Sequence, residues 1–185
     1  MSGIIGLTGL MGTGKTSIVD LCNENQKYHV IKLGEYLRRR ETSSDYSIEN
    51  LELKAEQIKS NLEHKSLGEF FLDSINNSLE ENKIVIVDSI RTIEDVKFFS
   101  KITTNFIMVM IILDEQTRIE RLSKRRRNFD PKNIDEIRQH DKWEMDFGIK
   151  YIFPLVNKYI INNSLEDSVK EFEEYVCRSE LYDSE

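Results

Sequence analysis

The stretch that decides the fold lies near the N-terminus and reads Gly9-Leu10-Met11-Gly12-Thr13-Gly14-Lys15-Thr16. It satisfies the pattern G-x-x-x-x-G-K-[ST] at every position, and it follows an apolar run, residues 4–8, that is typical of a β-strand. Glycines in such a loop let backbone N–H groups turn toward a phosphate, and the N-terminus of the following helix adds partial positive charge. The pattern therefore predicts a strand, a phosphate-binding loop and a helix, in that order.

The residue types in the loop also predict what each position does. We expect Lys15 to reach the β- and γ-phosphates of ATP and the Thr16 hydroxyl to bind Mg²⁺. The expected ATP-binding set is Gly9, Met11, Gly12, Thr13, Gly14, Lys15, Thr16 and Ser17.

Strand-like and helical patterns alternate along the rest of the chain. Apolar runs over residues 4–8, 29–33, 84–87, 106–113 and 159–161 predict five strands, and helical spacing appears over 16–23, 48–62 and 67–79. Two more helices follow Thr92 and Ser164, each with an acidic residue three positions on in capping-box spacing. This alternation favours an α/β fold with three layers: a doubly wound, five-stranded parallel sheet between helices.

The length of 185 residues predicts a single domain. Its core is expected over residues 1–34, 84–124 and 150–185. One helical insertion is expected over about 35–83. Residues 128–148 are polar and weakly periodic, which suggests a second insertion over about 125–149.

Composition narrows the class of protein. The net charge of −7 argues weakly against nucleic acid as the main partner, because such binding draws on Lys and Arg. The longest apolar run, residues 106–113, is far shorter than the ~20 residues that span a bilayer. Cys22, Cys177 and the three histidines show no metal-binding spacing. We expect a cytoplasmic protein with reduced thiols and no membrane partner.

The third predicted strand ends in a carboxylate. Residues 84–87 (IVIV) precede Asp88, which is the Walker B pattern. Ligands of open α/β folds bind outside the carboxyl ends of the strands, where Asp88 would emerge. There Asp88 is expected to hold Mg²⁺ through water or to accept a proton from the substrate.

Polar residues follow two of the predicted strands. Arg38 comes after the second strand and Arg91 after the third, so both are expected at the edge that holds the loop. Guanidinium groups suit bidentate phosphate recognition, although an exposed surface arginine is the alternative for each. Glu35 either positions the acceptor or a metal-bound water, or caps the next helix.

A basic run follows the fourth strand and contains Arg118, Arg121, Lys124, Arg125, Arg126 and Arg127. It could form an exposed helix face, a nucleic-acid patch or a lid over phosphates. Cationic groups that close over a transferring phosphoryl group contribute ~10³–10⁵ in rate. We favour the lid, with Arg121 and Arg125 acting in catalysis and Arg127 near the substrate.

Together these residues resemble the nucleoside-monophosphate-kinase group of P-loop kinases, which includes adenylate kinase and dephospho-CoA kinase. Residues 34–38 (GEYLR) are similar to its G-D-x-x-R element, and residues 88–91 (DSIR) to its D-G-x-x-R element. Residues 159–166 resemble the last strand and loop, which lie near the adenine, so the resemblance implies a nucleotide contact for Asn163. The resemblance is closest, over nearly the whole chain, to a largely archaeal, dephospho-CoA kinase-like family.

The resemblance implies an ATP-dependent phosphotransferase that acts on a small, phosphate-bearing acceptor. The insertion over 35–83 would bind the acceptor, and that over 125–149 would be the lid. Departures leave the acceptor open between a nucleoside monophosphate and dephospho-CoA. Ser89 stands in place of the usual Gly, Glu35 in place of Asp and Arg126 in place of Gly, and no D-x-D element follows the second strand.

Two functions of another class are alternatives. A GTP-dependent switch would need N-K-x-D, but Ile160 stands where residues 157–160 (NKYI) require the Asp. An ATPase acting on a protein or nucleic acid usually places Glu after the Walker B Asp, where this chain has Ser89. Because the chain lacks the residue that each alternative requires, its sequence favours a small-molecule kinase over both.

Overall fold

The computed structural model describes residues 2–39, 48–61, 66–125 and 130–179. Five parallel strands form one sheet in the order β2-β3-β1-β4-β5. The strands are β1 (Gly3–Thr8), β2 (Tyr28–Lys32), β3 (Ile84–Asp88), β4 (Phe106–Ile112) and β5 (Lys158–Ile161). The first strand, β1, lies in the middle of the sheet between β3 and β4, so the chain extends the sheet on both sides of it, as a doubly wound topology requires. The predicted fold class is confirmed.

Helices connect the strands and cover the sheet. They are α1 (Lys15–Cys22), α2 (Leu33–Arg39), α3 (Ile48–Asn61), α4 (Leu72–Glu80), α5 (Ile93–Ile102), α6 (Glu115–Arg125), α7 (Ile134–Glu144), α8 (Lys150–Ile152) and α9 (Leu165–Arg178). Two 3₁₀ turns, η1 (Leu67–Phe71) and η3 (Phe153–Leu155), and a π-helix, η2 (Met145–Ile149), complete the described chain. Within these residues no helix has the length and apolarity needed to cross a membrane.

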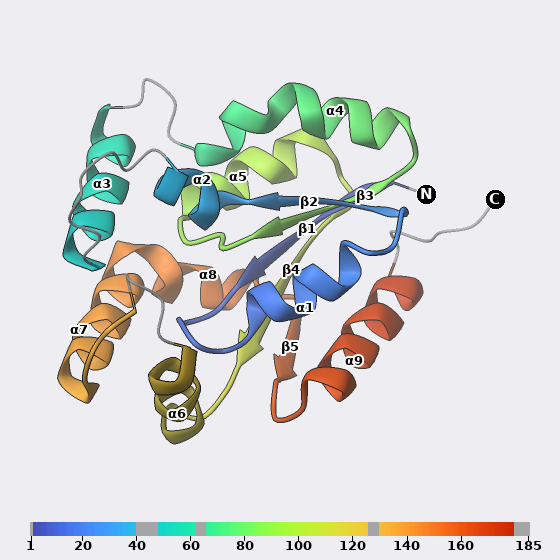
Figure 1. The fold of residues 1–185 in the computed structure, drawn as a ribbon. Helices are drawn as coiled ribbons and strands as arrows, with labels where there is room; N and C mark the ends of the chain where they lie inside the picture. The colour runs from blue at the N-terminus through green and yellow to red at the C-terminus, as the bar shows by residue number, and fades with distance from the viewer. Residues whose placement is uncertain (1, 40–47, 62–65, 126–129, 180–185) are drawn as a thin grey trace.

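Alternating side chains of the strands build a core on each face of the sheet. Ile5 and Ile86 point to the face covered by α1 and α9, where Phe172 packs. Ile4 and Val85 point to the opposite face, which α4, α5 and α8 cover. Figure 1 shows α4 and α5 on one side of the sheet and α1 and α9 on the other. Strands buried on both faces explain the continuous apolar runs in the sequence.

The chain passes from β2 into α2 without a loop. The predicted strand reached residue 33, but β2 ends at Lys32 and Leu33 begins α2. Leu33 is buried in the core cluster of the α4–α5 face, which anchors the first turn of α2 at the carboxyl edge of the sheet. As a result, Glu35 and Arg38, two of the residues predicted to bind the acceptor, lie within the first two turns of this helix.

Residues 130–149 belong to the second predicted insertion. Although their sequence is polar and weakly periodic, they form α7 and the segment η2. Asn133 caps α7: its Oδ1 accepts from the Glu136 N–H at 2.9 Å, and its Nδ2 donates to the Glu136 side chain at 2.6 Å. Such a reciprocal cap stabilises the start of a helix. In Figure 1, α7 and α3 lie beyond the carboxyl ends of the strands.

Candidate functional site

The phosphate loop follows β1 and has a backbone that requires its glycines. Gly9, Gly12 and Gly14 adopt φ angles of 133°, 85° and 91°, in the left-handed region that L side chains rarely adopt. At Gly14 a Cβ would also lie 2.1 Å from Nδ2 of Asn162. The spacing of glycines in the motif is therefore set by backbone geometry, and α1 begins directly after them at Lys15.

Lys15 lies inside this loop. Its ammonium group donates to the carbonyl oxygens of Gly9, at 2.5 Å, and Leu10, at 3.0 Å. Burial lowers the pKa of Lys15 to about 8, although the negative charges of Glu144 and Asp88 oppose this effect. A phosphate that enters the loop would offer the ammonium group stronger, charged acceptors than these two carbonyls.

The two residues predicted to bind Mg²⁺ are in contact. The Thr16 hydroxyl donates to Oδ2 of Asp88 at 3.1 Å, and Asp88 is buried at the end of β3. Carboxylate and hydroxyl oxygens are hard donors of the kind that Mg²⁺ prefers. The donor set therefore fits this ion, and Asp88 belongs beside the phosphate loop as the Walker B pattern predicts.

Ser89 turns the chain sharply after Asp88. Its φ of 74° lies in the left-handed region, which explains why the similar kinases usually have Gly here. A residue held in this conformation costs about 1–3 kcal/mol. The Ser89 hydroxyl donates to Oδ1 of Asp88 at 3.1 Å, and the next residue, Ile90, donates its N–H to the Leu7 carbonyl at 2.9 Å. These contacts fix the path of the backbone toward Arg91.

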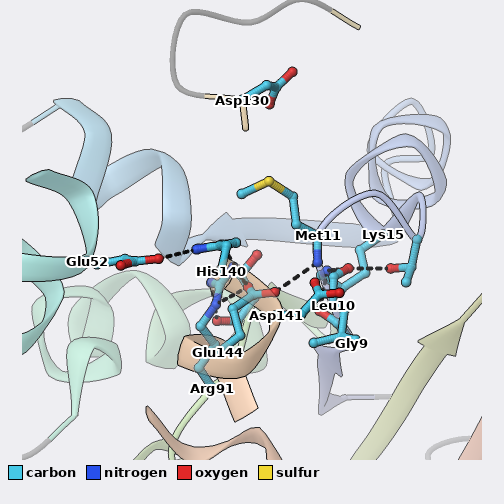
Figure 2. Close-up of polar contacts among 12 residues, drawn as sticks. Gly9, Leu10, Met11, Lys15, Glu52, Arg91, Asp130, His140, Asp141 and Glu144 are labelled. Atoms are coloured by element: carbon cyan, nitrogen blue, oxygen red, sulfur yellow. Dashed lines mark hydrogen bonds and ion pairs between the residues drawn. The ribbon is translucent and has the colours of Figure 1, made fainter. Parts of the chain in front are cut away.

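Arg91 is held by an internal partner. Its Nε and Nη2 atoms both donate to Oε1 of Glu144, at 2.8 and 2.6 Å. Oε2 of Glu144 accepts from the Met11 N–H in the phosphate loop at 2.9 Å (Figure 2). Burial alone would raise the pKa of Glu144, but the positive charges of Arg91, His140 and Lys15 lower it to about 2. Arg91, which is predicted to bind the acceptor, therefore lies beside the loop, and its partner is the carboxylate of Glu144 in α7.

Arg38 and Glu35 lie on α2. A Cβ placed on Gly34 would be 3.3 Å from Nη1 of Arg38 and 3.7 Å from the Ser89 hydroxyl oxygen, so these two side chains lie close together. Gly34 thus separates Arg38 from the turn that follows β3, and the acceptor role of Arg38 stays a prediction. Glu35 accepts a hydrogen bond from Arg39, one turn further along α2, at 2.7 Å.

A cavity of about 330 Å³ adjoins the other side of the loop. Its lining residues are Gly12, Gly14, Ser17, Arg121, Leu122, Arg125, Asn162 and Leu165. Arg121 donates to the Asn162 carbonyl at 2.9 Å, and Arg125 pairs with Asp130. Two of the three arginines predicted for the lid therefore border the loop, while Arg127 lies outside the described residues.

Asn162, the residue before the predicted nucleotide contact Asn163, binds the loop. Nδ2 of Asn162 donates to the Thr13 carbonyl at 2.7 Å, and its Oδ1 accepts from the Ser168 hydroxyl at 3.1 Å. Asn162 is buried, whereas Asn163 is exposed and is not among the residues that line the cavity. The nucleotide contact of Asn163 stays a prediction, and the side chain that faces the loop is that of its neighbour, Asn162.

Sequence reasoning missed three residues of α7. They are His140, Asp141 and Glu144: Glu144 points toward the loop, whereas Nδ1 of His140 bonds to Glu52 of α3 (Figure 2). Asp141 pairs with both terminal nitrogens of Arg118, which is 3% exposed and also donates to the Met11 carbonyl at 2.9 Å. Arg118, counted within the basic run, is thus a buried structural residue. The capping box at Asn133 could have indicated this helix in the sequence.

These features, a glycine loop around a buried lysine and a Thr–Asp pair on a sheet ordered 2-3-1-4-5, define a P-loop nucleotide-binding protein with a nucleotide-kinase type of fold. The chain belongs to the AAA domain family, whose model matches residues 5–144, and within it to the UPF0200 proteins. The UPF0200 protein of Staphylothermus marinus is 30% identical over 170 residues, covering 91% of this chain and 86% of that protein. The UPF0200 protein MJ1399 of Methanocaldococcus jannaschii is 27% identical over 175 residues, covering 92% and 87%.

Solved structures share the fold. A shikimate kinase from Acinetobacter baumannii in complex with shikimate superposes with a TM-score of 0.59 at 15% identity, covering 98% of this chain and 96% of that one. A gluconokinase from Sinorhizobium meliloti superposes with a TM-score of 0.58 at 20% identity, covering 95% and 92%. The predicted likeness to P-loop kinases is confirmed at the level of the fold. The closer likeness to dephospho-CoA kinase is not confirmed and stays a prediction.

Proposed function

We propose that the protein is an ATP-dependent small-molecule kinase that transfers the γ-phosphoryl group to a phosphate-bearing, nucleotide-like acceptor. A nucleoside monophosphate is the first candidate acceptor and dephospho-CoA the alternative. The observation that carries the proposal is the placement of Arg38 and Arg91, from two different elements, beside one turn next to the phosphate loop. Two solved structures of the same fold carry the names of small-molecule kinases, which supports this class of reaction.

On the donor side, the phosphate loop binds the triphosphate of ATP. Lys15 gives up its bonds to the Gly9 and Leu10 carbonyls and neutralises the β- and γ-phosphates. Thr16 and Asp88 hold Mg²⁺, which when bound adds positive charge against the phosphate oxygens. The nucleoside part occupies the cavity lined by Arg121 and Asn162, and Asn163, the predicted nucleotide contact, follows Asn162 in the chain.

On the acceptor side, Arg38 and Arg91 bind the acceptor's own phosphate with their guanidinium groups. Glu35 orients the acceptor from the first turn of α2, within the insertion over residues 35–83. Asp88 either organises the metal or accepts a proton from the attacking group, which is a phosphate oxygen in a nucleoside monophosphate and a hydroxyl in dephospho-CoA. The nucleophile is then aligned with the γ-phosphorus, and no covalent enzyme intermediate is needed.

During transfer, negative charge spreads over the equatorial oxygens of the phosphoryl group. Arg121 and Arg125 already border the loop, and Arg127 follows them in the basic run. In this proposal the segment over residues 125–149 acts as a lid, and these arginines close over the transferring group. Closure excludes water, which limits the hydrolysis of ATP when no acceptor is bound.

The test is an acceptor screen with the full chain. ATP and Mg²⁺ are incubated with each nucleoside monophosphate and with dephospho-CoA, ADP release is measured, and the phosphorylated product is identified by mass spectrometry. We expect rapid ADP release with one acceptor and little without any, and Lys15→Ala should abolish both. Fast hydrolysis without an acceptor, stimulated by DNA, RNA or a protein, would instead establish the ATPase alternative.

A further inference from the structure

Glu144 lies at the centre of a cluster of donors that come from different elements. Its Oε2 accepts from the backbone N–H of Met11, and its Oε1 accepts twice from Arg91. Lys15 and His140 add positive charge nearby, with Nε2 of His140 lying 3.8 Å from Oε1. The carboxylate is fully buried although it comes from a helix outside the sheet. Figure 2 shows it between the loop and Arg91.

This cluster has the composition of a phosphate site. It combines a backbone N–H of the phosphate loop, a guanidinium group that donates twice and a buried ammonium charge. Each of these groups suits a phosphoryl oxygen at least as well as a carboxylate oxygen. Since one set of donors holds one anion at a time, a phosphoryl group could bind here only after Glu144 has left.

The position of the cluster identifies which phosphoryl group competes for it. The β-phosphate belongs over the N–H groups at the start of α1, from Gly14 onward. Met11 lies earlier in the loop, and its N–H is joined through Glu144 to Arg91 on the acceptor side. The carboxylate therefore lies between the donor and acceptor positions, where the group to be transferred must be.

We infer that Glu144 is an internal substitute for the γ-phosphate and makes the site discriminate nucleoside triphosphates from diphosphates. The γ-phosphate displaces the carboxylate and takes over the Met11 N–H, and the N–H groups that Glu144 releases on Arg91 are then shared between the γ-phosphate and the acceptor. A diphosphate binds the loop and leaves Glu144 where it is. This inference rests on the proposed function, because it assigns the same loop and the same arginine to phosphates.

The local fold allows the carboxylate to leave while the arginine stays in place. Glu144 is the last residue of α7, and the π-helix η2 begins immediately after it. Within η2, Gly148 packs against the backbone of Arg91 so closely that a Cβ would lie 2.2 Å from the Arg91 carbonyl oxygen. The backbone of Arg91 is thus fixed independently of its side-chain partner. Gly148 itself has a non-helical backbone, with φ 164° and ψ −18°, so the chain is kinked between Glu144 and α8.

The chain contains its own reporter of this displacement. Trp143, the only tryptophan, directly precedes Glu144. Its ring stacks on those of His140 and Phe147, with centroids 5.5 and 4.7 Å apart, and its Nε1 donates to Glu56 of α3 at 2.8 Å. Movement of Glu144 changes the surroundings of this indole, so its fluorescence should follow the state of the site.

The experiment compares two nucleotides on the full chain, with Mg²⁺ present. A non-hydrolysable ATP analogue and ADP are each titrated, Trp143 emission is recorded, and binding is measured independently by calorimetry. In the wild type we expect both to bind and the analogue alone to change the emission. In Glu144→Gln the competing charge is lost, so affinity for the analogue should rise by roughly tenfold while affinity for ADP changes little. Asp146→Asn, which removes an exposed carboxylate two residues away, should behave like the wild type.

Equal emission changes with both nucleotides in the wild type would overturn the inference, as would weaker analogue binding in Glu144→Gln. If that variant does not fold, Glu144→Asp, which keeps the charge but shortens its reach, should give the same preference for the analogue. The comparison of Trp143 emission with the analogue and with ADP in the wild type tests the inference without either variant. Absence of binding by both nucleotides would overturn the proposed function together with this inference. Binding of both without discrimination would overturn the inference alone.

Discussion

Asn162, at the end of β5, donates from Nδ2 to the carbonyl oxygen of Thr13 in the phosphate loop at 2.7 Å. The same side chain accepts from the Ser168 hydroxyl of α9 and is 1% exposed. One amide thus joins the last strand and the last helix to the loop that follows the first strand. The shape of the loop depends on a contact between residues that are 149 positions apart.

Asn162→Ala should destabilise the fold and the loop together. Each polar group left buried without a partner costs ~1–3 kcal/mol, and for a chain of this size each kcal/mol lowers the melting temperature by roughly 2–4 °C. Thermal unfolding followed by circular dichroism measures the effect. Asn163→Ala is the matched comparison, because Asn163 is exposed and should leave the melting temperature unchanged. Equal shifts in the two variants would contradict the role assigned to Asn162.

Lys15→Ala should remove the stabilisation that ATP·Mg²⁺ gives to the wild type. At a hundredfold excess over the dissociation constant, ligand binding adds ~2.7 kcal/mol to the free energy of unfolding. This corresponds to a rise in melting temperature of roughly 5–10 °C. Lys150→Ala removes an exposed lysine of α8 and should keep the full rise. An undiminished rise in Lys15→Ala would show that the nucleotide binds elsewhere.

Arg38→Lys should weaken turnover of the acceptor without affecting ATP. Lysine keeps the positive charge but lacks the paired N–H donors with which a guanidinium group binds a phosphate in bidentate fashion. A hydrogen bond to a charged group contributes ~1.5–3 kcal/mol. We therefore expect kcat/KM for the acceptor to fall roughly 10- to 150-fold, measured by steady-state kinetics. Arg39→Lys, on the same helix with a side chain that is 79% exposed, is the control and should change little. If ATP affinity fell as much as acceptor turnover, Arg38 would belong to the nucleotide side.

Acid should destabilise the protein partly through Glu144. Its pKa is lowered from 4.5 to about 2, with Arg91, His140 and Lys15 facing it. A carboxyl group whose pKa is lowered in the folded state stabilises the fold above its unfolded pKa, and this contribution is lost as pH falls toward the folded value. The loss should therefore occur between about pH 4.5 and 2. Urea unfolding of the wild type and of Glu144→Gln across this range should show a shallower acid dependence in the variant. Identical dependences would mean that other carboxyl groups dominate.

Much of the fold could be predicted because its signals are local. The loop motif, the continuous apolar runs and the capping residues Thr92 and Ser164 each specify a structure within a few neighbouring residues. Asp88 could be placed for the same reason, since a residue that ends a parallel strand next to β1 must emerge beside the loop.

The contacts made by α7 could not be predicted in this way. Glu144 meets Met11 across 133 positions and Arg91 across 53, and no local pattern in the sequence specifies either partner. The basic run was misleading for the same reason: Arg118 belongs to it by composition, but its position on the inner face of α6 buries it against Asp141. The contact of Asn162 with Thr13 likewise spans 149 positions, so no local pattern specifies it.

The bonds from Lys15 to the Gly9 and Leu10 carbonyls have a consequence for the kinetics of binding. Because the lysine closes the loop on itself, an incoming nucleotide must break two internal bonds before it makes its own. Association that includes such a rearrangement is slower than a diffusional encounter between preformed surfaces. A tight complex would therefore owe its affinity to a long residence time, and rapid exchange of ATP for ADP would be limited by reopening of the loop.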